Sequence, residues 1–392
     1  MQKFSYALAG LALAVLGAGA ANAQGTVKVG IINEYSGQFA DTGNQIDNGI
    51  KLYVKQHGDT VAGKKIEFIR KDTGGIAPDI AKRLAQELVV RDAADIFAGF
   101  SLTPNALAAA DVSAEAKKFM VVMNAATAII TTKSPYIART SSTTPQLNYT
   151  LGTWAAKNGI KTAYTMVSDY GPGIDAETWF QTGFKEGGGQ IVGSVRFPVA
   201  NPDFSAFIQA AKDKNPDAIY IWIPGGTQPA AVGKALAERG IDPAKTKVLG
   251  QDALGDETAL KSMGDASIGI ITVSDYDYTH KSPLNQQFVK AFNDEFHRNP
   301  DFFAVGGYDG THLIYQALNK AGGKADGDSL IAAAKGMAWE SPRGQISIDP
   351  ETRDIVQTVY IRRVQKVGDR LENVEFDSVP NVKDPAKARM TH

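Results

Sequence analysis

One stretch decides the fold of this chain: Asp95-Ile96-Phe97-Ala98-Gly99-Phe100-Ser101-Leu102-Thr103-Pro104. An apolar run ends here in a turn with two hydroxyl side chains, and a helix-like stretch follows at once. A second stretch repeats the apolar run and polar turn: Phe119-Met120-Val121-Val122-Met123-Asn124-Ala125-Ala126-Thr127. Open α/β sheets bind small ligands at the carboxyl ends of parallel strands, where helix N-termini favour anions. The two turns therefore predict a site for a small carboxylate that needs no cationic side chain.

Strand-like and helix-like segments alternate on both sides of these turns. Residues 27–32 predict a strand, residues 46–54 have helical spacing that stops at Gly58, and Pro78 opens a further helix. A second series of the same kind starts near Pro145. This βαβ organisation predicts an α/β protein with parallel sheets and helices on both faces, and with the same doubly wound motif used twice.

The first 23 residues have the features of a cleaved signal peptide. Lys3 supplies a positive charge, residues 6–20 are apolar, and Ala21-Asn22-Ala23 is an A-x-A cleavage site. A membrane anchor is the alternative, but the apolar run is shorter than the roughly 20 residues that a spanning helix needs. We therefore expect an exported mature chain that begins at Gln24.

Length and composition narrow the function classes. The chain has 392 residues, which is enough for two domains, and a formal net charge of −1. A nearly neutral chain argues against a nucleic-acid partner, because binding to phosphates needs a basic surface. There is no cysteine, so the exported chain has to be stable without disulfides.

One loose dinucleotide-binding pattern, G-x-G-x-x-A, is present at residues 171–176. Pro172 lacks a backbone N–H, and Asp169 and Asp175 flank the place where a pyrophosphate would lie. The pattern therefore predicts an ordinary turn between a strand and a helix, and no nucleotide cofactor.

Patterns for metal binding and catalysis are equally weak. Residues 275–279 resemble the start of a calcium loop, but the sixth position is His280 and the twelfth is Gln286. The five histidines have no metal-ligand spacing, and the sequence has none of the common hydrolase, metalloprotease or P-loop motifs. We expect no metal, no cofactor and no catalytic residue.

The order of several short motifs resembles that of one known family, the periplasmic solute-binding proteins of the leucine/isoleucine/valine-binding type, which serve ABC importers. The resemblance covers residues 26–378. The motifs that carry it are Gly30-Ile31-Ile32, Ser36-Gly37, Gly43, Asp72, Asn124 to Thr127, Arg139-Thr140-Ser141, Asp169-Tyr170-Gly171, Gly250-Gln251-Asp252, Ser341 to Gly344 and Asp349-Pro350.

The resemblance implies two lobes with three hinge crossovers and a ligand in the cleft between the lobes. Carried over by position, lobe one is residues 24–143 plus 277–354, and lobe two is residues 144–276 plus 355–378. Residues 379–392 are then a C-terminal tail.

In the family, a Ser or Thr hydroxyl, a backbone N–H and a Thr hydroxyl hold the ligand carboxylate. The resemblance implies Thr103, Ala125 and Thr127 for these roles, next to Asn124 in the second turn. Two alternatives stay open: both threonines could be helix caps, and Ser101 could replace Thr103.

Two further residues match family positions on lobe two. Tyr170 matches a lid tyrosine, with a packed loop tyrosine as the alternative. Asp252 falls where amino-acid binders place an acid against the ligand ammonium, and its alternative is an N-cap before Glu257 and Leu260.

The sequence departs from the amino-acid binders in the side-chain pocket. Thr42 and Gly225 stand where those proteins often have aromatic residues, which predicts a larger pocket. The candidates for its walls, each with the core as an alternative place, are Phe39, Phe100, Trp222, Phe303 and Tyr308. Some relatives in the family carry aromatic acids, and a roomy pocket suits them.

The resemblance therefore implies a monomeric, non-enzymatic binding protein of an ABC uptake transporter. It would capture a small hydrophobic carboxylate, either an aromatic acid or a hydrophobic amino acid, and dock on an inner-membrane permease. The rival interpretations are an extracytoplasmic sensor module of the same fold and, least favoured, a secreted hydrolase.

Overall fold

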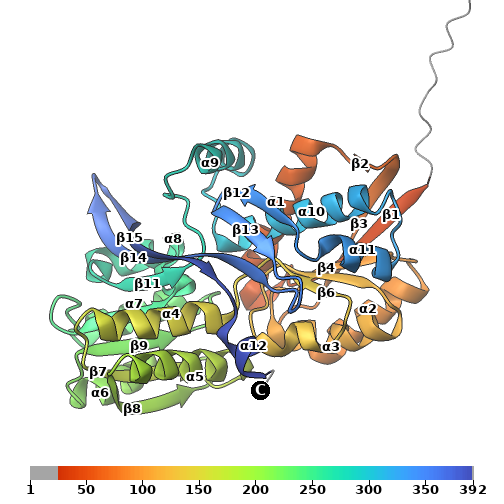
Figure 1. Ribbon diagram of the computed structural model, residues 1–392. Coiled ribbons are helices and arrows are strands. Elements are labelled where there is room, and N and C mark those ends of the chain that lie inside the picture. Colours follow the sequence, from red (N-terminus) through yellow and green to blue (C-terminus); the bar gives the residue numbers. More distant parts are fainter. Residues whose placement is uncertain (1–24, 391–392) are drawn as a thin grey trace, which may run out of the picture.

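The computed structural model describes residues 25–390, so the predicted signal peptide lies outside the described residues. Two separate β-sheets organise the chain, one on each side of the molecule in Figure 1. We call them the first and the second sheet. The pattern of alternating strands and helices is confirmed: helix α1 (Ala40–His57) ends before Gly58, and helix α2 (Pro78–Val90) begins at the expected proline.

The first sheet has six strands in the order β2-β3-β1-β4-β5-β6. All neighbours are parallel except the short β2, which is antiparallel to β3. The strands are β1 (Thr26–Asn33), β2 (Thr60–Val61), β3 (Lys64–Asp72), β4 (Ile96–Gly99), β5 (Phe119–Val122) and β6 (Ile137–Arg139).

The second sheet has the order β12-β13-β14-β11-β10-β9-β7-β8, and β15 also pairs with β14. Strands β7 to β11 are parallel, whereas β12 to β15 are antiparallel additions. The strands are β7 (Thr162–Ser168), β8 (Gln190–Phe197), β9 (Ala218–Trp222), β10 (Lys247–Gln251), β11 (Ile271–Ser274), β12 (Ala338–Ser341), β13 (Gly344–Ile348), β14 (Ile355–Val367) and β15 (Arg370–Val382).

Both sheets contain the same doubly wound motif. The order β3-β1-β4-β5-β6 in the first sheet corresponds to β8-β7-β9-β10-β11 in the second. This confirms that the motif is used twice. In such a sheet, the crevice beyond the carboxyl ends of the strands, where the strand order reverses, is where ligands bind.

Helices cover both faces of each sheet. Buried apolar clusters join α1, α10 and α11 to one face of the first sheet and α2 and α3 to the other. Similar clusters join α4 and α5 to one face of the second sheet and α6, α7 and α8 to the other. The helices are α1 (Ala40–His57), α2 (Pro78–Val90), α3 (Thr103–Glu115), α4 (Thr144–Lys157), α5 (Gly171–Glu186), α6 (Phe204–Asp213), α7 (Gln228–Glu238), α8 (Glu257–Met263), α9 (Pro283–Phe296), α10 (Phe302–Lys320), α11 (Gly327–Ala334) and α12 (Pro385–Met390).

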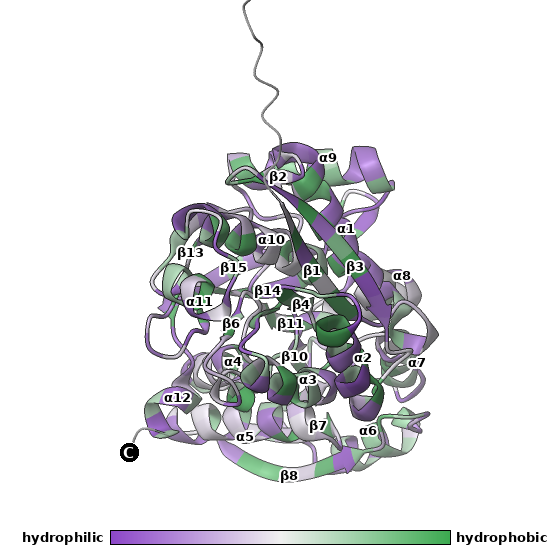
Figure 2. Cartoon of the chain, turned by 90° about the vertical axis from the view of Figure 1, so that its right-hand side faces the viewer, coloured by the Kyte–Doolittle hydropathy of each residue, from purple (hydrophilic) through white to green (hydrophobic). Residues whose placement is uncertain are grey.

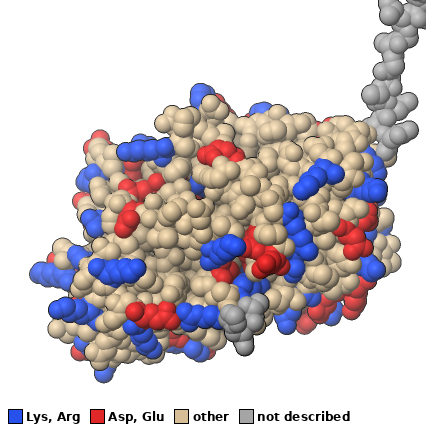
Figure 3. All heavy atoms as spheres, viewed as in Figure 1, with Lys and Arg blue, Asp and Glu red and all other residues tan. Residues whose placement is uncertain are grey.

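Burial follows this layering. Figure 2 shows hydrophobic residues on central strands such as β1 and β4, and hydrophilic residues on outer helices such as α2. Figure 3 shows basic and acidic side chains interspersed on the face in view, in keeping with the small net charge. In the described part of the chain, no helix is both long and apolar enough to cross a membrane.

The chain passes three times between the part of the molecule packed on the first sheet and the part packed on the second. The first two passages are residues 140–143, after β6, and residues 275–282, after β11. The third is residues 349–354, between β13, which packs into the core of the first sheet, and β14, whose Val359 and Ile361 pack into a core of the second. Buried Arg343 connects these passages, because its guanidinium donates to the Thr140 carbonyl, to Asp275 and to Gln357 beside the third passage. The predicted lobe boundaries at residues 143, 276 and 354 fall within or beside these passages and stay a prediction.

The segment from residue 379, expected to be a tail, is largely part of the folded body. Residues up to Val382 continue strand β15, and α12 lies between the two sheets near the C-terminus in Figure 1. Lys387 is buried and donates to the Thr131 hydroxyl over 2.7 Å, and it also pairs with Asp354. The described part of this segment is therefore anchored by burial and an ion pair.

Candidate ligand-binding site

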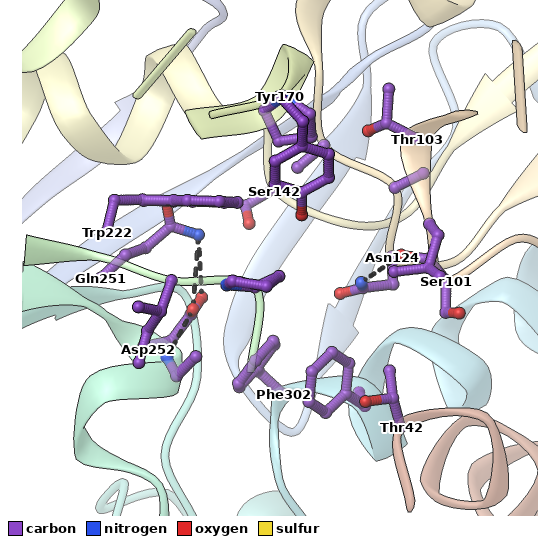
Figure 4. A pocket seen from close by; sticks show the side chains of 18 residues that line it. Thr42, Ser101, Thr103, Asn124, Ser142, Tyr170, Trp222, Gln251, Asp252 and Phe302 are labelled. Carbon is purple, nitrogen blue, oxygen red and sulfur yellow. Dashed lines mark hydrogen bonds between the residues drawn. The ribbon is translucent and has the colours of Figure 1, made fainter. Parts of the chain in front are cut away.

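An inner pocket lies between the two sheets, at the carboxyl ends of strands from both (Figure 4). Its volume is about 50 Å³ in this conformation. Eighteen residues line it: Thr42, Ser101, Leu102, Thr103, Asn124, Ala125, Ala126, Ser142, Tyr170, Pro172, Trp222, Ile223, Pro224, Gln251, Asp252, Ala253, Phe302 and Phe303. A cavity that binds benzene measures about 150 Å³, so a ring enters only if side chains or the two sheets move apart.

The first turn reaches the pocket through a strained backbone. Gly99 has a φ of 98° and Phe100 a φ of 63°, in the left-handed region that a phenylalanine rarely adopts. The Phe100 side chain is fully buried in the core beneath α2 and α3, and it does not line the pocket. Ser101 and Thr103 line the pocket instead, and α3 begins at Thr103 with its N-terminus at this edge.

The two candidate threonines bind each other. The Thr103 and Thr127 hydroxyl oxygens are 3.1 Å apart, and neither side chain caps a helix. The capping alternative is therefore wrong for both residues. Thr103 lines the pocket but Thr127 does not, so the structure gives Thr127 a contact with the Thr103 hydroxyl rather than with the pocket.

The second turn is tied to the first by hydrogen bonds. Asn124 donates to the Ser101 carbonyl over 2.7 Å, and the Ala125 N–H donates to the Phe100 carbonyl over 2.9 Å. The Ala125 N–H, implied by resemblance as a carboxylate donor, is thus already engaged within the fold. Ser101 has a buried hydroxyl without a partner in the described residues, so it is the more suitable donor to a ligand. We call Ser101, Thr103 and Asn124 the hydroxyl end of the pocket.

Arg139 stabilises the second turn without lining the pocket. This fully buried guanidinium donates to the carbonyls of Ala125 and Thr127, at 3.2 Å and 2.8 Å, and pairs with Asp354 at 2.5 Å. The turn is therefore fixed by a buried ion pair, and the arginine does not reach the pocket.

Residues that follow strands of the second sheet make the opposite side. Tyr170 precedes α5 and lies beside Trp222, with ring centroids 5.8 Å apart. Gln251 and Asp252, at the end of β10, form what we call the acid end of the pocket. Figure 4 shows Tyr170 and Phe302 between the hydroxyl end and the acid end.

Asp252 is a buried acid with an unusual pKa. Burial raises the pKa of its carboxyl to about 7, the Asp275 charge adds to the increase, and Arg362 opposes it. Asp252 Oδ1 accepts the Ala253 N–H over 2.8 Å. The cap of α8 is Asp256, which accepts the Ala259 N–H over 2.6 Å, so the capping alternative for Asp252 is wrong.

Of the remaining candidate residues, some line the pocket and others do not. Thr42 and Phe303 line it. Gly225 lies at its rim, where an added Cβ would be 3.7 Å from the Phe303 ring and 3.8 Å from Ala253. Tyr308 faces away from the pocket, because its hydroxyl donates to Gln56 over 2.7 Å and its ring packs against Tyr53 and Phe288.

Several lining residues were not singled out as ligand-binding in the sequence. Ser142 lies in the first passage between the sheets, Phe302 begins α10, and Gln251 is the last residue of β10. Gln251 was visible only as a neighbour of Asp252, and nothing in the local patterns indicated its role. Trp222, in contrast, was a predicted candidate for the pocket wall, and it lines the pocket. Phe39, another such candidate, is buried but is not among the lining residues.

A larger outer chamber of about 690 Å³ adjoins the inner pocket. The two cavities share the walls Thr42, Asp252, Phe302 and Phe303. On the far side of the chamber, Asn299 donates to Glu257 over 3.2 Å, and near the inner pocket Asp175 accepts the Ala128 N–H over 3.2 Å. Because both bonds join the two sides of the cleft, this conformation is a closed one.

The rejected motifs have structural roles. An added Cβ on Gly173 would meet the Ser168 carbonyl oxygen at 1.9 Å, so this glycine allows α5 to approach β7 closely. Asp275 and Asp277 pair with Arg343 and Arg362. No cluster of three potential metal-ligating side chains occurs among residues 25–390.

Comparison with known proteins gives consistent matches. A family model described as "periplasmic binding protein" matches residues 26–369. The curated "Leu/Ile/Val-binding protein homolog 6" of Brucella melitensis is 39% identical over 383 residues, which are 97% of this chain and 98% of that protein.

Two solved structures match over nearly the whole chain. A solute-binding protein of an ABC transporter from Rhodopseudomonas palustris BisB5, in complex with 3,4-dihydroxybenzoic acid, is 55% identical with a TM-score of 0.89, and the match covers 92% of this chain and 99% of that one. A second such protein, from Rhodopseudomonas palustris HaA2 with p-hydroxybenzoic acid, is 40% identical with a TM-score of 0.90, and the match covers 93% and 100%.

Proposed function

The chain belongs to the periplasmic binding protein family and is a solute-binding protein of the ABC-transporter type, and from that premise we propose that its ligand is an aromatic carboxylate with a ring hydroxyl. The carboxylate would lie at the hydroxyl end and the ring hydroxyl at the acid end. The ring would lie between the aromatic walls.

The separation of the two polar ends carries this proposal. In Figure 4, Ser101, Thr103 and Asn124 lie on one side of the pocket, and Gln251 and Asp252 lie on the other. An α-amino acid carries its carboxylate and its ammonium on one carbon, whereas a ring with a hydroxyl opposite its carboxylate carries polar groups at two distant ends. The second arrangement fits the pocket better.

The hydroxyl end suits a carboxylate without a cationic partner. The Ser101 hydroxyl has no protein partner in the described residues, and the first N–H groups of α3 have no acceptor within the helix. Each hydrogen bond to a charged group contributes about 1.5–3 kcal/mol, and the helix N-terminus adds a favourable field.

The walls suit a flat apolar ring. Tyr170, Trp222, Phe302 and Phe303 line the space between the two ends. Aromatic rings prefer offset-stacked or edge-to-face contacts, which are worth about 0.5–1.5 kcal/mol beyond burial. The solved relatives at 55% and 40% identity hold hydroxylated benzoic acids, which supports the same ligand class for this chain.

A hydrophobic amino acid is the second candidate. The name of the relative at 39% identity points to leucine, isoleucine or valine, and Asp252 offers a carboxylate to an ammonium. Such a ligand would require an ionised Asp252 to pair with its ammonium, because an unpaired charge in a closed cleft is very costly.

We further propose that the chain works in the periplasm as a monomer, binds its ligand without altering it, and docks in its closed form on an inner-membrane permease. The low net charge and the family support this assignment. Closure about the three passages would bring the two ends together on the ligand.

Calorimetric titration tests the ligand class. The protein, first unfolded and refolded to remove bound ligand, is titrated with 4-hydroxybenzoate, benzoate and leucine. We expect 4-hydroxybenzoate to bind tightest. Tight binding of leucine without binding of either aromatic acid would contradict the proposal.

A further inference from the structure

A directed chain of hydrogen bonds ends at Asp252. The Tyr220 hydroxyl donates to Asn148 Oδ1 over 2.5 Å, and Asn148 Nδ2 donates to Gln251 Oε1 over 2.8 Å. Gln251 Nε2 then donates to Asp252, 3.3 Å from Oδ1. All four side chains are buried, so this chain is part of the core rather than of the surface.

The direction of the chain is fixed at two points. Asn148 Nδ2 also donates to the Thr144 carbonyl over 2.8 Å, and a carbonyl can only accept. The Trp222 indole N–H donates to Gln251 Oε1 over 2.8 Å, and an indole N–H can only donate. Reversing the Gln251 amide would put its NH₂ group against two donors, so Nε2 has to face Asp252.

The Gln251 side-chain amide thus binds two residues that line the pocket, Trp222 and Asp252. Gln251 Oε1 fixes the plane of the Trp222 indole, which lies beside Tyr170, and Nε2 fixes the Asp252 carboxyl. Asp252 Oδ1 accepts the Ala253 N–H as well, whereas Oδ2 lies 3.5 Å from Gln251 Nε2, at the limit of a hydrogen bond. Oδ2 therefore keeps capacity for a hydrogen bond from a ligand.

We propose that Gln251 is the positioning residue that sets specificity: it orients Asp252 and Trp222 together, so that the pocket selects aromatic acids with a ring hydroxyl over those without one. This inference rests on the proposed function and adds the residue that controls the choice. An acid held in place without a hydroxyl partner is left unpaired, which is the physical basis for rejecting the unsubstituted ring.

Two substitutions separate the two tasks of Gln251. Gln251→Glu keeps an oxygen for Asn148 and Trp222 but replaces the fixed N–H donor to Asp252 by a second carboxyl. Since two buried carboxyl groups this close share one proton, Asp252 no longer faces a fixed donor and its own acceptor capacity changes. Gln251→Met removes the acceptor for Trp222 as well. Gln209→Glu is the matched control, because Gln209 also donates to an acid, Asp213, at 2.7 Å, but on the exposed surface.

The first measurement is the ratio of the dissociation constants for benzoate and 4-hydroxybenzoate. We expect the parent to prefer 4-hydroxybenzoate by about 30-fold, well within what a buried polar partner supplies. Gln251→Glu should reduce this ratio to within about threefold, since the oriented acceptor is lost. Gln251→Met should weaken both ligands, and Gln209→Glu should keep the parent ratio.

The second measurement needs no ligand. The indole ¹⁵N–H resonance of Trp222, assigned by its loss in Trp222→Phe, reports the hydrogen bond to Gln251. It should shift and exchange faster with solvent in Gln251→Met, and change less in Gln251→Glu. An unchanged ratio in Gln251→Glu, or an unchanged Trp222 resonance in Gln251→Met, would overturn the inference. If the parent binds neither aromatic acid, the proposed function fails, while the Trp222 resonance still decides the positioning role.

Discussion

The hydroxyl end of the pocket is made by two neighbouring turns of the first sheet, whereas the acid end is assembled from separate elements of the second. Ser101 and Thr103 follow β4, and Asn124 follows β5. The two turns are joined by the hydrogen bond from the Ala125 N–H to the Phe100 carbonyl and by the one from the Asn124 side chain to the Ser101 carbonyl. At the acid end, Asp252 depends on residues from α4, β9 and β10. The first end is a local structure, and the second depends on tertiary contacts.

The largest expected effect comes from replacing Arg139, which stabilises the second turn of the hydroxyl end. Arg139→Met would leave Asp354 buried without its arginine partner, and it would remove one donor from each of the carbonyls of Ala125 and Thr127. Breaking a buried pair on one side costs about 3–5 kcal/mol, so the free energy of unfolding in urea should fall by that amount. Arg91→Met is the control, because Arg91 is exposed and its pair with Glu87 should contribute less than about 0.5 kcal/mol. Equal losses in the two variants would contradict a supporting role for Arg139.

The same difference explains what the sequence could predict. The turns at the hydroxyl end are contiguous, so the apolar runs before them and the hydroxyls within them predicted the sheet edge and a polar pocket wall. The two-sheet architecture followed from the alternation of strands and helices. The roles of single atoms did not follow, because the engagement of the Ala125 N–H and the contact between Thr103 and Thr127 depend on how the two turns meet.

The acid end was only partly predictable. Asp252 was found by resemblance, but Asn148, Tyr220 and Gln251 lie up to 103 residues apart in the chain and join only after folding. The prediction that Phe100 forms a pocket wall was wrong. Phe100 stands in the turn that reaches the pocket, but its backbone has a positive φ and its side chain lies in the core. Local patterns predict elements, whereas the direction of a side chain depends on tertiary packing.

The second prediction compares Thr103, which belongs to the hydroxyl end, with Thr127, which binds the Thr103 hydroxyl without lining the pocket. Thr103→Val should weaken binding of 4-hydroxybenzoate by about 2 kcal/mol, because a hydrogen bond to a charged group is lost. Thr127→Val should cost about half as much, since Thr127 acts through the Thr103 hydroxyl. Calorimetry at constant pH measures both values. A larger loss for Thr127→Val would restore the direct contact that the resemblance implied.

The third prediction concerns Asp252 itself. Asp252→Asn keeps an acceptor oxygen, so it should cost a hydroxylated aromatic acid only about 1 kcal/mol, in the range of a neutral hydrogen bond. For an amino acid the same change would break a buried charge pair and cost about 3–5 kcal/mol. Titration of the variant with both ligand classes decides between them. Tight leucine binding by the parent that disappears in the variant would favour the amino-acid alternative.

The smallest effect is a pH dependence confined to the acid end. Burial raises the pKa of the Asp252 carboxyl to about 7, so this group changes charge near neutrality, while a ligand carboxylate stays ionised. A ring hydroxyl donates best to the ionised form, because a charge-assisted hydrogen bond is the stronger one. Benzoate offers no donor and leaves an ionised Asp252 unpaired, so it binds the protonated form better. The preference for 4-hydroxybenzoate over benzoate should therefore increase by about threefold from pH 6 to pH 8, less than the tenfold that a full unit of pKa change would give.

Other charged groups face Asp252 or lie in the adjoining chamber. Asp275 and Arg362 act on Asp252, and burial also raises the pKa of Asp301, in the outer chamber, to about 7. Asp252→Asn is the control for them, since it should remove the pH dependence of the preference and leave any contribution from Asp301 in place. A preference that varies with pH to the same extent in Asp252→Asn would assign the effect to another group and remove Asp252 from the recognition of the ring hydroxyl.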